Sequence, residues 1–167
     1  MNIKKEMVIN RPVDEVWEVL GNQFADAYKW ARGLNHSEGH GKQSFGNATF
    51  DHRTCEVDGF GKIQEVLKRF DPENYVLTYE VAEGFPGFIS SAVNTWSLSE
   101  EGSKTKVNMH LVMETTGIKG TLMGPMMKMQ LNKTVAGVVS DLKAYVETGR
   151  PSKQKEKEIA KMAKKAA

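Results

Sequence analysis

The segment NTWSLSEEGSKTKVNMHLVME at residues 94–114 contains two strand patterns separated by a turn. Before the turn, Asn94, Trp96 and Leu98 share one parity, and Glu101-Gly102 is typical of a tight turn. After it, every second side chain is apolar: Val107, Met109, Leu111 and Met113. Alternation with a period of two is typical of a strand that buries one face. The segment therefore predicts an antiparallel hairpin, and its second strand has the cleanest pattern in the chain.

Upstream of this hairpin the chain shows further strand patterns. Apolar residues of one parity recur at residues 3–9 and 75–81, and the second stretch follows an Asp71-Pro72 turn. Asp58-Gly59 separates residues 54–57 from residues 62–66 and is typical of a hairpin turn. Frequent glycines between residues 33 and 61 also favour short strands joined by tight turns. We expect one strand at the amino terminus and five or six more after residue 33.

Helical patterns lie on both sides of these strands. Pro12 suits the first position of a helix that buries one stripe, and Gly21 is expected to end that helix. A second short helix is predicted at residues 23–30. Between residues 121 and 148 a broad apolar stripe predicts one long helix, and Pro125 either lies in its first turn or limits its regular part to later residues. The stripe consists of Met127, Leu131, Val135, Val138, Leu142 and Tyr145.

Composition places these elements in one globular domain. The chain has 167 residues, of which 40% are hydrophobic and 26% charged, and a net charge of +2 that gives no indication of nucleic-acid binding. The single cysteine, Cys55, excludes an intrachain disulfide framework. No apolar run reaches the roughly 20 residues of a membrane span, and the amino terminus lacks the pattern of a secretory signal. We therefore expect a cytoplasmic protein without stable membrane insertion.

The charge is concentrated at the carboxy terminus. Residues 150–167 hold seven lysines or arginines and two glutamates, so they carry +5 and residues 1–149 carry −3. Ile159 and Met162 are the only large apolar side chains of this tail, too few to bury it against a core. We predict a domain of residues 1–149 and a flexible, solvated, basic tail of residues 150–167. A weak contact of the tail with an anionic surface is the alternative.

The order of elements predicts an α+β fold. A sheet with alternating faces must cover its apolar face, and the long carboxy-terminal helix is the only element large enough. Three stretches resemble the START/polyketide-cyclase superfamily, also called SRPBCC: RPVDEVWEVL at 11–20, GKIQEVLKRFDPENYVLTYEV at 61–81, and the hairpin at 94–114. The resemblance implies the helix-grip fold, a curved antiparallel sheet wrapped around the long helix, with two short helices after the first strand.

The same resemblance implies a cavity between sheet and helix that is open to hydrophobic small molecules or lipids. Its expected walls are Trp17, Tyr79, Trp96, Met109, Leu111, Met127, Leu131 and Val138. Asn94 shares the face of Trp96 and is a candidate polar anchor. In the segment after residue 50, His52 and Glu56 would share one face of a strand, and Arg53 and Cys55 the other. His52 and Glu56 are further candidate anchors, or they belong to an exposed strand face with ordinary charge pairs.

No sequence motif identifies a reaction. A nucleophile elbow, a phosphate loop and a dinucleotide fingerprint are missing, and His36 and His40 lie too far apart along a strand to bind one metal ion. We expect no cofactor and no metal. The prediction is a protein that binds or transports a hydrophobic or amphipathic small molecule, and a polyketide cyclase or dehydratase is the enzymatic alternative. A third alternative is a protein- or membrane-interaction module or homodimer that uses the tail or the cluster Met123, Met126, Met127 and Met129.

Overall fold

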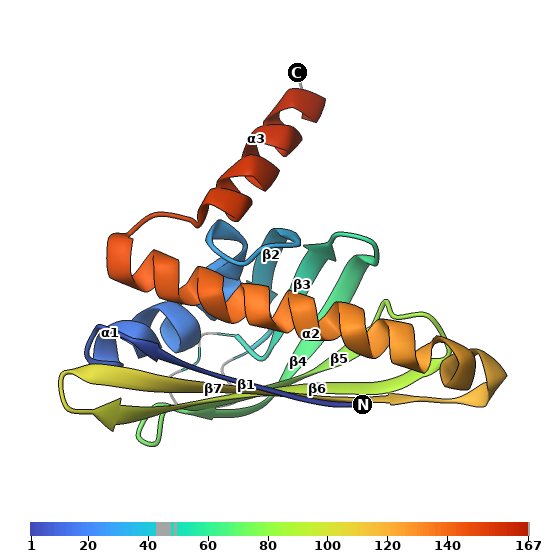
Figure 1. The fold of residues 1–167 in the computed structure, drawn as a ribbon, viewed down its shortest axis with the longest axis horizontal. Coiled ribbons are helices and arrows are strands. Elements are labelled where there is room, and N and C mark those ends of the chain that lie inside the picture. Colours follow the sequence, from blue (N-terminus) through green and yellow to red (C-terminus); the bar gives the residue numbers. More distant parts are fainter. Residues whose placement is uncertain (43–47, 49, 167) are drawn as a thin grey trace.

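One antiparallel sheet forms the framework of the protein (Figure 1). The computed structural model describes residues 1–42, 48 and 50–166. The sheet has seven strands in the order β1-β7-β6-β5-β4-β3-β2. Their bounds are β1 (Asn2–Ile9), β2 (Leu34–His40), β3 (His52–Val57), β4 (Gly61–Asp71), β5 (Val76–Glu83), β6 (Ile89–Glu101) and β7 (Lys104–Thr115). Every neighbouring pair is antiparallel, as the alternating sequence patterns predict.

The β6–β7 hairpin is the longest pairing in the sheet. Asn94 pairs with Leu111, Trp96 with Met109, and Leu98 with Val107. All but Leu111 of these are buried, so the predicted apolar face is the face that points into the core. Gly102 turns the chain in the left-handed region, at φ +64°, where a residue without Cβ is least strained.

Three short helical pieces follow β1, namely α1 (Val13–Trp17), a π-helical turn η1 (Glu18–Asn22) and a 3₁₀ helix η2 (Phe24–Lys29). The chain stays helical through Gly21, whereas the sequence had suggested that the helix ends there. The reason is packing, because a Cβ on Gly21 would lie 2.5 Å from the indole of Trp17. Glycine therefore allows the helix to continue beneath a buried tryptophan.

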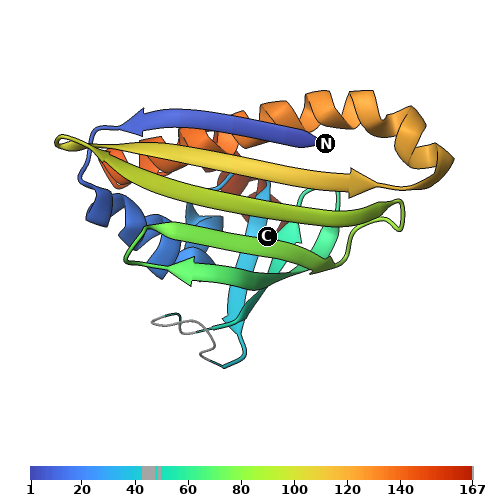
Figure 2. The same ribbon diagram turned by 90° about the horizontal axis from the view of Figure 1, so that it is seen from below.

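The long helix α2 (Gly117–Thr148) runs along the concave face of the sheet (Figures 1 and 2). Its second half buries Val135, Val139 and Leu142 against the core. Pro125 lies inside α2, which therefore begins eight residues before the proline rather than at it. A proline removes one helical hydrogen bond and bends the axis, and this part of the helix faces solvent, where water can bind the freed carbonyl. The sheet and α2 together confirm the helix-grip fold.

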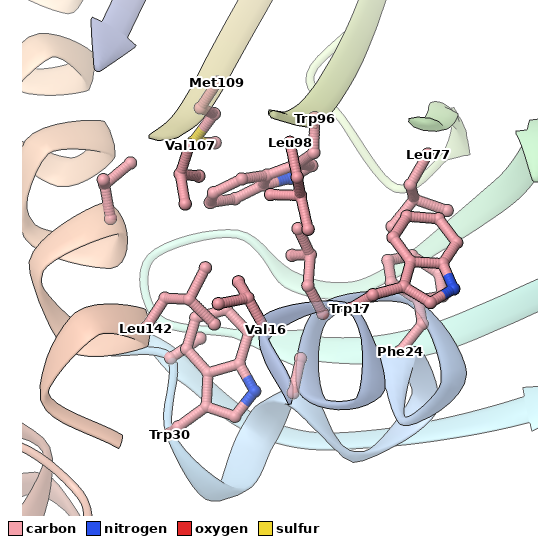
Figure 3. Close-up of a cluster of buried hydrophobic side chains, with 14 of the residues drawn as sticks. Val16, Trp17, Phe24, Trp30, Leu77, Trp96, Leu98, Val107, Met109 and Leu142 are labelled. Atoms are coloured by element: carbon pink, nitrogen blue, oxygen red, sulfur yellow. The ribbon is translucent and has the colours of Figure 1, made fainter. Parts of the chain in front are cut away.

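The core lies between the sheet, the short helices and α2. Figure 3 shows Val16 and Trp30 near Leu142 of α2, and Trp17 near Leu77 and Phe24. The strands β6 and β7 contribute Trp96, Leu98, Val107 and Met109. Burial of such large apolar side chains is the main source of stability for a domain of this size.

Residues Lys153–Ala166 form a further helix, α3, which projects away from the body of the protein (Figure 1). Its first turn is attached, in contrast to the solvated tail expected from composition. The fully buried ammonium of Lys155 donates to the backbone carbonyl of Leu34 at 2.6 Å, and a carboxylate oxygen of Glu158 accepts from the backbone N–H of Gly33 at 2.9 Å. Burial lowers the pKa of Lys155.

Asp141 links α2 to both the η2–β2 connection and α3. This fully buried carboxylate accepts from Nε and Nη2 of Arg32 at 2.8 and 2.7 Å, and from Oγ of Ser152 at 2.5 Å. A buried carboxylate must keep such partners, because its desolvation is otherwise uncompensated.

We expect Asp141→Asn to lower the free energy of unfolding by about 3 kcal/mol, because it removes the charge that Arg32 faces in a buried position. Asp26→Asn is the control, since it breaks an exposed pair with Lys29 and should cost less than about 1 kcal/mol. Urea denaturation followed by circular dichroism measures both. Equal losses in the two variants would contradict a structural role for the pair of the partly exposed Arg32 with the buried Asp141.

Candidate functional site

A cavity of about 480 Å³ lies between the concave face of the sheet, η2 and α2. Its volume is in the range of small-molecule sites, and most of its wall is apolar. The sheet contributes Arg53, Ile63, Glu65, Tyr79, Val81, Ala92, Asn94, Trp96, Met109, Leu111 and Met113, and α2 contributes Met127, Gln130, Leu131, Thr134 and Val138. Leu20, Phe24, Ala27 and Trp30 cover the side formed by the short helices.

Most of the wall residues expected from the sequence lie on this cavity. They are Tyr79, Trp96, Met109, Leu111, Met127, Leu131 and Val138. Trp17 does not lie there, since its ring packs on Phe70 and Tyr75 with centroids 5.4 and 5.9 Å away. The next inward position of the same helical segment, Leu20, lines the cavity instead.

The face of strand β3 that points into the protein is not the face that carries the candidate anchors His52 and Glu56. His52 is half-buried outside the cavity and contacts Oδ1 of Asp51 through Nδ1 at 2.5 Å, and Glu56 is exposed. Arg53 and Cys55 point into the protein. Neither His52 nor Glu56 is therefore placed to anchor a ligand in this cavity.

Arg53 faces Glu65 across the β3–β4 pair. Its Nε and Nη2 donate to Oε2 of Glu65 at 2.8 and 2.5 Å, and its Nη1 donates to the carbonyl of Phe24 at 2.5 Å. The guanidinium carbon also lies 3.6 Å from the centre of the Phe24 ring, a cation–π contact. Burial is the largest single effect and opposes the charge, but the Glu65 carboxylate, together with Cys55 and Tyr79, outweighs burial and raises the pKa of Arg53.

The pairing of Arg53 with Glu65 could have been predicted from the sequence, because the alternation of side chains along β4 indicates it. Ile63, Glu65 and Leu67 share one parity of β4, so the carboxylate stands in a row of apolar residues. Such a position indicates a buried carboxylate, which needs a cationic partner on a neighbouring strand. Arg53 is that partner, and the hairpin register places it directly opposite.

A second polar pair lies on β5 and β6. Nδ2 of Asn94 donates to the hydroxyl oxygen of Tyr79 at 2.7 Å. Burial and the Glu65 carboxylate raise the pKa of Tyr79 to about 12, against the opposing effects of Arg53 and of hydrogen bonds from Trp96 and Asn94. Tyr79 therefore stays neutral, and because its oxygen accepts these bonds, its own hydrogen can be donated to another group.

Two cavity-lining residues have a buried polar atom without a hydrogen-bond partner among the described residues. They are Oδ1 of Asn94, an acceptor, and Nε1 of Trp30, a donor. Nε1 of Trp17 also has no hydrogen-bond partner among the described residues, but Trp17 does not line the cavity. Because buried polar groups are almost always paired, orphaned atoms indicate where water or a ligand group completes a site.

Two aromatic rings from different turns meet at the rim of the cavity. Phe60 follows β3 and Phe85 follows β5, and their ring centres are 5.0 Å apart. Arg32, Gly33 and Glu158 also belong to the lining, so the anchored turn of α3 reaches the same cavity.

The described residues contain no cluster of three or more histidine, cysteine or acidic side chains that could hold a metal ion. The rings of His40 and His52 stack at 5.6 Å, and His36 lies against Tyr28.

Among the described residues, no helix combines the length and the apolar character needed to cross a bilayer.

We expect Arg53→Met to lower the free energy of unfolding by about 3–5 kcal/mol, because it leaves the Glu65 carboxylate buried without its partner. The double variant Arg53→Met/Glu65→Met should recover at least about 2 kcal/mol of that loss, since it removes both charges. Thermal and urea unfolding of the two variants, with Glu65→Met alone, complete the cycle. Additive losses would show that the two charges do not interact.

Cys55 is expected to react slowly with a thiol reagent. It is fully buried, its Sγ lies 3.4 Å from Oε2 of Glu65, and burial raises its pKa to about 12. Because only the thiolate reacts, labelling of the native protein at pH 8 should be at least about a hundredfold slower than in guanidinium chloride. The control is Cys55→Ala/Thr54→Cys, which moves the thiol to the half-exposed neighbour. Equal rates at the two positions would contradict the buried, neutral thiol.

Comparisons with known proteins agree with this architecture. No curated protein matches the chain. A START superfamily protein from Mycobacterium smegmatis superposes with a TM-score of 0.71 at 14% identity, over 87% of this chain and 97% of that protein. A protein from Thermus thermophilus gives 0.69 at 20% identity, over 87% and 97% of the two chains.

The di-domain ARO/CYC protein BexL from the BE-7585A biosynthetic pathway has a TM-score of 0.67 at 10% identity, over 87% of this chain and 47% of BexL. Likenesses at these identities show the fold alone, because one fold serves many functions. A family model described as polyketide cyclase / dehydrase and lipid transport matches residues 1–147. The sequence resemblance to the START/polyketide-cyclase superfamily is thereby confirmed, and the chain belongs to the polyketide cyclase / dehydrase and lipid transport family.

Proposed function

We propose that this protein binds a hydrophobic or amphipathic small molecule in the cavity between the sheet and α2, as a carrier or sensor. The observation that carries the proposal is the distribution of polarity around a cavity of about 480 Å³. Apolar side chains cover most of the wall, and four polar side chains, Arg53, Glu65, Tyr79 and Asn94, come from the strands β3 to β6. Such a wall orients an apolar molecule by one polar group.

The chemistry of these groups favours a ligand whose polar end is uncharged. Arg53 and Glu65 neutralise each other, so this pair offers no free charge to a carboxylate or an ammonium. Tyr79 can donate its O–H, and Oδ1 of Asn94 can accept a hydrogen bond. A hydroxyl or carbonyl group fits this pair better than an ion.

Methionines suit the apolar part of such a ligand. Met109, Met113 and Met127 lie on the cavity, and the flexible thioether side chain adapts to irregular shapes. The expectation is a site that tolerates several related apolar skeletons and selects them through one polar group.

A cyclase or dehydratase activity is the second candidate, because ionisable groups line the cavity and the family description includes such enzymes. A proton-transfer catalyst works best when its pKa lies near the working pH. The pKa of Tyr79 is about 12, and the Glu65 carboxylate is engaged by Arg53. Neither group is thus suited to act as a base near neutral pH, and this favours binding over catalysis.

The test is native mass spectrometry of the protein purified from its own host, combined with titration of a fluorescent fatty alcohol. We expect a bound mass that is released on unfolding. Val138→Trp should weaken probe binding by at least about tenfold, because the indole fills cavity space. Ala136→Trp is the matched control, since Ala136 is exposed on the outer side of α2.

The polar end is tested with Tyr79→Phe, which keeps the ring and removes the donor. It should weaken binding of the fatty alcohol by about five- to tenfold and leave binding of the corresponding hydrocarbon unchanged.

Unchanged affinity in Val138→Trp would contradict binding in this cavity. Turnover of a poly-β-carbonyl substrate that disappears in Tyr79→Phe would favour the enzyme instead.

A further inference from the structure

The first half of α2 carries a row of large apolar side chains that point to solvent. Ile118, Leu122, Met126 and Met129 are 81%, 76%, 61% and 57% exposed. Their spacing of three and four residues places them on one side of the helix. We call these four residues the apolar ridge. Single exposed apolar residues are ordinary, but a continuous row of this kind indicates an interaction surface.

The charged residues in the part of α2 that carries the apolar ridge have one sign. Residues 117–140 contain Lys119, Lys128 and Lys133 and no aspartate or glutamate. Lys128 and Lys133 are exposed. The nearest acidic residues in the sequence are Glu114, on β7, and Asp141, whose buried carboxylate is held by Arg32 and Ser152. This half of α2 therefore combines exposed apolar side chains with lysines as its only charged residues.

The ridge lies on the same part of α2 that forms one wall of the cavity. Met127 and Leu131, on the opposite face of the same helix turns, line the cavity. The β5–β6 loop lies at the same end of the molecule as the first turns of α2 (Figure 2), and its Phe85 contacts the exposed Phe60 at the cavity rim. Exposed apolar groups thus occur at this end of the molecule on more than one element.

We propose that the apolar ridge docks on the surface of an anionic lipid bilayer. Apolar side chains enter the boundary between headgroups and acyl chains, and flanking lysines are attracted to anionic headgroups. Lys128 and Lys133 supply this attraction on the ridge helix itself. Docking in this orientation brings the end of the protein that holds Phe60 and Phe85 close to the bilayer.

A second copy of the chain fits this surface less well. A two-fold contact would place the same patch on both sides, so the lysines of one copy would face those of the other without a carboxylate from this part of the helix. The helix α3 is also basic, but among the described residues Ile159, at 40%, is its one exposed large hydrophobic residue. It offers charge without a comparable apolar row.

The test measures co-flotation of the full chain with vesicles of phosphatidylcholine, with and without phosphatidylglycerol. We expect binding that increases with phosphatidylglycerol and falls by about tenfold or more in Leu122→Ser/Met126→Ser, because two exposed apolar contacts are lost. Lys128→Glu/Lys133→Glu should abolish the preference for phosphatidylglycerol. Ile159→Ser is the matched control for an exposed apolar residue outside the ridge and should bind as the unchanged protein does.

Three results would overturn the proposal. The first is absence of vesicle binding. If sedimentation then showed concentration-dependent dimers that Leu122→Ser/Met126→Ser dissociates, the ridge would be an interface between two copies of the chain. The second is binding that survives the ridge substitutions, and the third is binding that is lost in Lys157→Glu/Lys161→Glu on α3 and kept in Lys128→Glu/Lys133→Glu. Thermal unfolding checks that each variant is folded. Vesicle binding needs no cavity ligand, so failure here leaves the proposed function intact, and the reverse also holds.

Discussion

The ion pair between Arg53 and Glu65 is the interaction on which the cavity depends. It joins β3 to β4, and through the carbonyl and ring of Phe24 it also holds η2 against the sheet. Two charges in an apolar wall are stable only while they remain paired and hydrogen bonded. The pair therefore links β3, β4 and η2 at one wall of the cavity, and each of its two charges neutralises the other.

The helix α2 meets two different requirements along its length. In its second half, Val135, Val139 and Leu142 fill the space against the sheet and short helices. In its first half, Met127 and Leu131 leave the cavity partly open, and the opposite side of the helix remains apolar in solvent. One half thus stabilises the domain by burial, and the other lines the cavity on one side and keeps apolar side chains in solvent on the opposite side.

The basic segment after Gly149 is part of the same structure. Ser152 and Arg32 share the carboxylate of Asp141, Glu158 binds the backbone N–H of Gly33 before β2, and Lys155 binds the carbonyl of Leu34, the first residue of β2. Glu158 also lines the cavity. The attachment of α3 therefore stabilises residues that form the rim, which connects the stability of the tail to the shape of the site.

Much of this architecture follows from short-range patterns. Alternation in the hairpin at residues 94–114 gave the two longest strands and their buried face, and Asp58-Gly59 gave the turn between β3 and β4. Helical periodicity gave the position of α2, although Pro125 lies within the helix and does not begin it. These features depend on neighbours within a few residues, where periodicity and turn chemistry are strong signals.

The site depended on contacts between distant residues. Polar side chains occupy both parities of β3, so no apolar face indicates which side is buried, and only pairing with β4 places Arg53 inside and His52 and Glu56 outside. In the same way, the buried ammonium of Lys155 donates a hydrogen bond to a carbonyl that lies 121 residues away in sequence. The sequence by itself determined the strands, the long helix and their inward faces, because these follow from local periodicity. Only the tertiary structure decided which charges are buried, because burial of a charge depends on a partner that another element must supply.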